Sequence, residues 1–126
     1  MKRKDLILNL IGEISNYLLD DDPMRLVISL HQEEDGLHLC ILDDTKHSED
    51  ELESMKKALN SRKRPELAEY YGAMTGHDML GSARLDLLGW QIKHSDVTQS
   101  DSGIKIDLWF GSEKFQSDKF SIPVKD

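Results

Sequence analysis

Four segments of the chain alternate apolar and polar residues, and they occur in two pairs. Residues 24–31 and 37–42 form the first pair, with the turn sequence Glu33-Glu34-Asp35-Gly36 between them. Residues 90–94 and 104–110 form the second pair, on either side of a wide polar turn. Alternation with period two predicts half-buried strands, and a turn sequence between two such strands predicts a hairpin. We therefore expect two β-hairpins.

Three other segments carry apolar residues at helical spacing. The first covers residues 4–19, with the stripe Leu6, Ile7, Leu10, Ile11, Ile14 and Leu18. In the second, Ser48 and Glu51 form a capping box ahead of Leu52, Met55 and Leu59. The third is predicted at residues 79–88, with Asp78 as its cap. Amphipathic helices beside alternating strands predict an α+β two-layer sandwich: an antiparallel sheet of two hairpins covered on one face by about three helices.

Length and charge narrow the classes of protein to consider. A chain of 126 residues suggests one domain over residues 1–126, with residues 111–126 as an edge strand or a loosely packed tail. The net charge of −8 argues against nucleic-acid and membrane partners, because phosphate binding needs clustered basic charge. The single cysteine, Cys40, suits a reducing cytoplasm, and the basic N-terminus leads into an amphipathic helix that holds several polar residues rather than into a signal peptide.

A polar stripe on the first helix is the leading candidate for a site. Asn9, Glu13 and Asn16 share one helix face, where a solvated helix usually shows Lys and Glu. The stripe is either an ordinary polar face or a present or former ligand or metal site. Residues 20–22 are three aspartates at the end of this helix, and we interpret them as a solvated acidic loop, with a cation site as the alternative.

The histidines offer no zinc motif at the sequence level. None of the five has a histidine partner at the spacing of a helical zinc site, so we do not expect a structural zinc. His47 and His77 are expected to meet Asp43 if the loops that carry them converge. A hydrolase of the Gly-x-Ser-x-Gly type is not expected, because that turn is absent from the sequence.

The order of elements and the polar stripe resemble the nucleotide-binding domain of histidine kinases, anti-sigma-factor kinases, certain heat-shock chaperones and gyrase-type enzymes (the histidine-kinase-like, or GHKL, ATPase domain). The family's first motif is a helix on which an Asn binds magnesium. Residues 9–13 occupy this position, with Glu13 in place of that Asn. The resemblance implies nucleotide or Mg²⁺ contacts at Asn9, Glu13 and Asn16, with Glu13 as the metal ligand.

The second motif of this family is an Asp that reads the adenine amino group, followed by Gly-x-Gly. Asp43 matches the Asp, and Thr45 and His47 stand in the places of the two glycines. The third motif is a glycine-rich stretch that holds phosphates at a helix N-terminus, and here Gly76 and Gly81 match it. Residues 62–64, Arg-Lys-Arg, would belong to the lid over the nucleotide.

Together these motifs resemble a degenerate member of the family, closest in size to stand-alone anti-sigma-factor-type regulators. The resemblance implies a small bacterial, cytoplasmic signalling domain that has weak or lost binding of ATP and Mg²⁺, is not an enzyme and acts by protein contact. Glu13 and Asp43 should then open onto the same concave surface. Two alternatives stay open: a plain α+β interaction module without a nucleotide site, and an active ATP-dependent protein-serine kinase.

Overall fold

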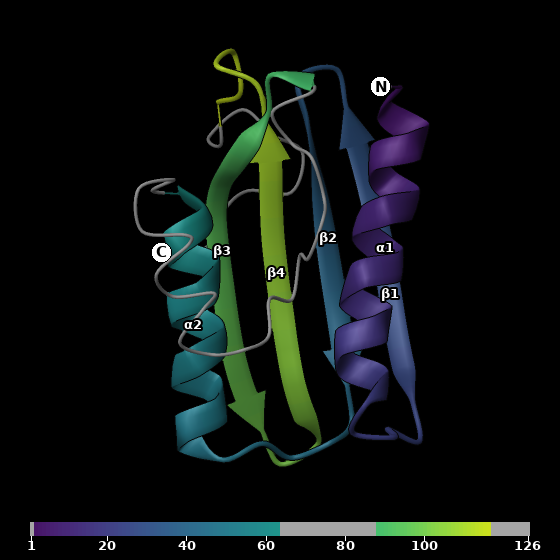
Figure 1. Cartoon of the computed structure of the whole chain (residues 1–126), viewed down its shortest axis with the longest axis vertical. Helices are drawn as coiled ribbons and strands as arrows, with labels where there is room; N and C mark the ends of the chain where they lie inside the picture. The colour runs from purple at the N-terminus through teal and green to yellow at the C-terminus, as the bar shows by residue number, and fades with distance from the viewer. Residues whose placement is uncertain (1, 64–87, 117–126) are drawn as a thin grey trace.

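The two hairpins join in one four-stranded antiparallel sheet, as predicted. The computed structural model describes residues 2–63 and 88–116. The strand order is β1-β2-β4-β3, and every neighbouring pair is antiparallel (Figure 1). The elements in chain order are α1 (Arg3–Leu19), β1 (Leu26–Glu33), β2 (Gly36–Asp43), α2 (Glu49–Lys63), β3 (Gln91–Ser100) and β4 (Gly103–Gly111).

Both described helices cover the same face of this sheet. Figure 1 shows α1 over the β1 side of the sheet and α2 along β3, and the buried residues of both helices belong to one core with the same face of the sheet. The buried stripes of the helices meet alternate residues of the strands, which is what the period of two dictates. The core contains Leu6, Leu10, Ile14 and Leu18 of α1, Met55 and Leu59 of α2, and Leu37, Leu39, Ile41, Ile104, Ile106, Leu108 and Phe110 of the sheet. The α+β class is thereby confirmed, while the helix expected at residues 79–88 lies outside the described residues except at its last position.

The strand β3 is longer than its sequence suggests. We expected residues 95–100 to form a wide polar turn, but β3 continues through them and pairs with β4 as far as Ser100 and Gly103. Only two residues then make the turn. Polar side chains are tolerated here because β3 is an edge strand with one face toward solvent, and Val97 still reaches the core. A β-bulge between Ile92 and His94 resets which residues face the helices.

Local signals at the helix ends agree with the structure. The amide of Glu51 donates to the Ser48 hydroxyl at 3.2 Å, and the Ser48 amide donates to the Glu51 carboxylate at 3.5 Å. These two bonds are the predicted capping box, and α2 begins directly after Ser48. Neither described helix is both long and apolar enough to cross a membrane.

Candidate functional site

A buried histidine surrounded by three carboxylates lies where β2 leads into α2. His47 Nδ1 donates a hydrogen bond of 3.0 Å to Glu51 Oε2, and it lies 3.7 Å from Asp21 Oδ2. His47 Nε2 lies 3.6 Å from Asp43 Oδ2. We call Asp21, Asp43, His47 and Glu51 the acidic–histidine cluster. It joins residues from the turn after α1, the end of β2, the β2–α2 connection and the first turn of α2.

The chain around His47 is held from both sides. Asp43 is the last residue of β2, and its Oδ1 accepts a 2.8 Å hydrogen bond from the Thr45 amide, which turns the chain out of the sheet. The His47 amide then donates to the side chain of Gln99 on β3 at 2.9 Å. Ser48, the residue after His47, caps α2, and the helix begins directly after this cap. Glu51, four residues after His47, then lies in the first helical turn within reach of the imidazole. Backbone bonds therefore fix where the imidazole lies.

The cluster has a buried end and a solvent-facing end. The side chains of Asp43 and His47 are 0% and 1% exposed, whereas those of Asp21 and Glu51 are 44% and 54% exposed. At the buried end, Asp43 Oδ2 and His47 Nε2 both lack a hydrogen-bond partner. Buried polar atoms are nearly always satisfied, because leaving one unpaired costs about 1–3 kcal/mol. An unpaired pair of atoms facing each other therefore calls for an explanation.

The charges of the cluster shift the pKa of one of its members, Glu51, and of one neighbouring side chain, Tyr17. The hydrogen bond from His47 is the main cause that lowers the pKa of the Glu51 carboxyl. Burial raises the pKa of the Tyr17 phenol, and the negative charges of Asp21 and Glu51 raise it further. Tyr17 therefore lies within electrostatic range of the cluster, on the edge of α1 that carries Glu13 one turn earlier.

The structure places the residues predicted from the sequence in different surroundings. Asp43 belongs to the cluster and faces His47, four residues later in the chain; the expected meeting with His77 stays a prediction. Glu13 is half-buried at the edge of α1, and Asn9 and Asn16 are exposed. Their roles as ligands stay predictions. Gly76, Gly81, His77, Asp78 and the side chains of residues 62–64 lie outside what the structure describes.

Two members of the cluster were missed as partners of His47. Glu51 had been assigned only to the capping box, although its spacing from His47 is the i, i+4 spacing that brings two side chains together at a helix. For Asp21, the sequence favours a solvated loop. No short-range pattern connects Asp21 with His47, because the first hairpin separates them along the chain.

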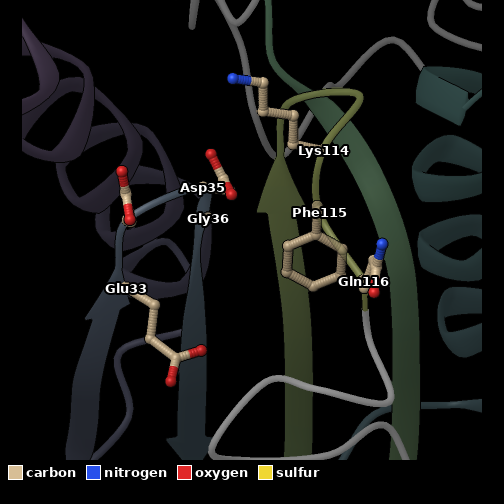
Figure 2. Close-up of a pocket in the computed structure, with 7 residues that line it drawn as sticks. Glu33, Asp35, Gly36, Lys114, Phe115 and Gln116 are labelled. Atoms are coloured by element: carbon tan, nitrogen blue, oxygen red, sulfur yellow. The ribbon is translucent and has the colours of Figure 1, made fainter.

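A groove of about 450 Å³ lies at the β1–β2 turn (Figure 2). Glu33 and Asp35 lie on its hairpin side, and Lys114, Phe115 and Gln116 lie on the segment after β4. The Phe115 ring packs so closely on the backbone of Gly36 and Gly111 that a Cβ at either position would overlap it.

The segment after β4 is further fastened there by the backbone. The Ser112 amide donates to the Asp35 carbonyl at 3.0 Å, and the Phe115 amide donates to the Ser112 carbonyl at the same distance. We therefore interpret this groove as the place where the chain after β4 attaches to the first hairpin, and the acidic–histidine cluster as the candidate site.

Comparison with known proteins finds no matching family model, no match among curated proteins and no match among solved structures. The fold and the acidic–histidine cluster are therefore the observations that bear on the function of this chain.

Proposed function

We propose that this chain is a small regulatory domain of the histidine-kinase-like type, which has weak or lost ATP binding and acts by contact with another protein. The observation that carries the proposal is that the carboxylate of Asp43 is closed off from solvent. Its carboxylate lies at the end of β2, where the resemblance requires an adenine-reading Asp, yet its side chain is fully buried against the imidazole of His47.

Reading an adenine amino group requires a carboxylate oxygen that the base can reach. Oδ1 of Asp43 already accepts the Thr45 amide, and Oδ2 faces His47 Nε2 at 3.6 Å. His47 stands where the family has its second glycine, a residue that leaves room for the base. With the imidazole in that place, an adenine base does not fit against Asp43.

The charge of the region also disfavours a nucleotide. Asp21, Asp43 and Glu51 contribute three carboxylates, and the resemblance adds Glu13 at the metal position. A triphosphate carries about four negative charges at neutral pH, and like charges at short range repel strongly where water is excluded. Binding would therefore depend on a cation that offsets both the protein and the phosphates.

Protein contact is supported by an apolar groove between α1 and the edge strand β1. Leu8 and Leu30 are 58% and 39% exposed, and they line a groove of about 260 Å³ with Ile7. Arg3 and Lys4 stand beside this apolar surface. An exposed apolar groove with a polar rim is typical of surfaces that bind other proteins.

Calorimetry with ATP, with and without Mg²⁺, tests the proposal. We expect a Kd no tighter than the high-micromolar range, which corresponds to roughly −5 to −6 kcal/mol, and no phosphoryl transfer to serine. Low-micromolar binding that is lost in Asp43→Asn would contradict the proposal and favour an active kinase. Thermal stabilisation by millimolar ATP distinguishes a weak site from a module with no site, because a bound ligand raises stability in proportion to RT ln(1 + [L]/Kd).

A further inference from the structure

We propose that Asp21, His47 and Glu51 bind a divalent transition-metal cation of the Zn²⁺ type, with Asp43 as the residue that orients the histidine. This site is distinct from the magnesium position that the resemblance assigns to Glu13. It also does not require a nucleotide, so it stands or fails independently of the proposed function.

The ligand atoms already have nearly the separations that such a site needs. His47 Nδ1 lies 3.0 Å from Glu51 Oε2 and 3.7 Å from Asp21 Oδ2, and one ligand atom from each of the three residues lies within 4.8 Å of the others. In a tetrahedral zinc site with bonds of about 2.0–2.1 Å, ligand atoms lie roughly 3.3 Å apart. The two separations from Nδ1 fall on either side of this value, and the third lies within 4.8 Å, so rotation of the two exposed carboxylates would complete the geometry.

The two buried atoms without a hydrogen-bond partner, Asp43 Oδ2 and His47 Nε2, also favour a metal-bound histidine. A histidine that binds a metal through one ring nitrogen usually donates the other N–H to a carboxylate. If Nδ1 gives up its proton and binds the cation, the proton on Nε2 faces Oδ2 of Asp43 at 3.6 Å. A shift of a few tenths of an ångström, on the order of the difference from an ordinary N–H···O bond, would then let the two atoms that now lack a partner bond to each other. In a neutral His47 without the cation, Nδ1 donates to Glu51 and this buried pair stays unsatisfied.

Charge and access favour a cation at the same position. Three carboxylates face one imidazole, which supplies at most one positive charge, so with the carboxylates ionised the cluster has a net charge of −2 or −3. Within residues 2–63 and 88–116, the ion pairs of these three carboxylates are all with His47. Because Asp21 and Glu51 are about half exposed, an ion can enter from solvent and keep water as a fourth ligand.

The donor set indicates which ions to test. One imidazole and two carboxylates suit zinc and its first-row neighbours, whereas Mg²⁺ and Ca²⁺ prefer sites built from oxygen alone. Co²⁺ is a useful probe because its visible absorption reports the coordination geometry directly. Mg²⁺ serves as the comparison ion.

The test is calorimetric titration of the chelator-treated full chain with Zn²⁺, without nucleotide. We expect one ion per chain and at least tenfold weaker binding in Asp21→Asn and in Glu51→Gln. The matched controls are Asp22→Asn and Glu49→Gln, which make the same chemical changes one residue from Asp21 and two from Glu51. Asp22 has a φ of 49°, which Asn tolerates, so its fold should be preserved. Both controls should bind within twofold of the parent chain.

The orienting role of Asp43 has its own readout. Asp43→Asn should weaken Zn²⁺ binding about 10- to 100-fold while a tetrahedral Co²⁺ spectrum is still reached at saturation. Thermal melting of each metal-free variant verifies that it is folded. The proposal is wrong if Zn²⁺ shows no stoichiometric binding tighter than about 100 μM, a free energy of about −5.5 kcal/mol, or if Asp21→Asn and Glu51→Gln bind as their controls do.

Discussion

His38 and Asp107 are joined across β2 and β4 by a buried hydrogen bond of 2.8 Å, from Nε2 to Oδ1. His38 alternates with the core residues of β2, so the pair lies on the sheet face opposite the helices. The imidazole also stacks on Trp109, with ring centroids 4.3 Å apart. A face that a two-layer sandwich commonly leaves to solvent thus carries a buried polar pair.

Removing the Asp107 side chain alone should destabilise the folded chain, because His38 stays buried without the carboxylate that it bonds to. The two side chains are 7% and 13% exposed. We expect Asp107→Ala to lower the free energy of unfolding by about 2–4 kcal/mol, measured by urea denaturation at pH 7. The double variant His38→Phe with Asp107→Leu should lose less than the two single variants added together. A loss below about 1 kcal/mol in Asp107→Ala would mean that the pair behaves like a surface ion pair.

Gly103 should not tolerate any side chain. Its φ is 129°, and a Cβ there would overlap the backbone of Asp43 and Asp44. Gly103→Ala should cost at least about 2 kcal/mol of unfolding free energy. The control is Gly12→Ala, in the exposed middle of α1 with open space around its Cβ position, which should stabilise the helix by up to about 1 kcal/mol. Equal effects of the two changes in denaturant titrations would contradict this account.

Restoring the two family glycines should open the carboxylate of Asp43. In Thr45→Gly with His47→Gly the imidazole is gone, while the backbone N–H that holds Oδ1 of Asp43 is retained. If His47 closes a nucleotide site, ATP should bind at least about tenfold more tightly, a gain of about 1.4 kcal/mol, by calorimetry. Adding Asp43→Asn in the same background should abolish the gain. An unchanged affinity would favour the interaction module without a nucleotide site.

The Tyr17 phenol should lose its proton at a higher pH than an ordinary tyrosine does. Burial, then the charges of Asp21 and Glu51, raise its pKa above the usual 10.0, so the folded state holds the phenolic proton more tightly than the unfolded chain. The resulting stability is fully present below pH 10 and is lost as the pH rises through the folded-state pKa.

The difference in absorbance between the parent chain and Tyr17→Phe isolates this phenol from Tyr70 and Tyr71. Asp21→Asn should move the isolated phenolate signal to lower pH, because it removes one of the two negative charges. If the signal moves to higher pH or stays in place, Asp21 does not act on Tyr17.

Much of the fold was readable in local sequence. The period of two in the β1 and β2 segments and the helical stripe of α1 predicted the elements and their buried faces, because each pattern spans only a few residues. The capping box at Ser48 and Glu51 marked the start of α2 for the same reason. The end of β3 was not readable, since its polar residues are held in the sheet by pairing with β4 rather than by their own periodicity.

The α+β class, the two hairpins and the acidic residue Asp43 at the end of β2 can all be read from local patterns in the sequence. The folded chain alone reveals that Asp21 meets the imidazole of His47, and that His38 pairs with Asp107 on the opposite face. The physical reason is that these contacts depend on how α1 and α2 pack on the sheet and on the register between β2 and β4. Such long-range geometry leaves no mark in the spacing of neighbouring residues.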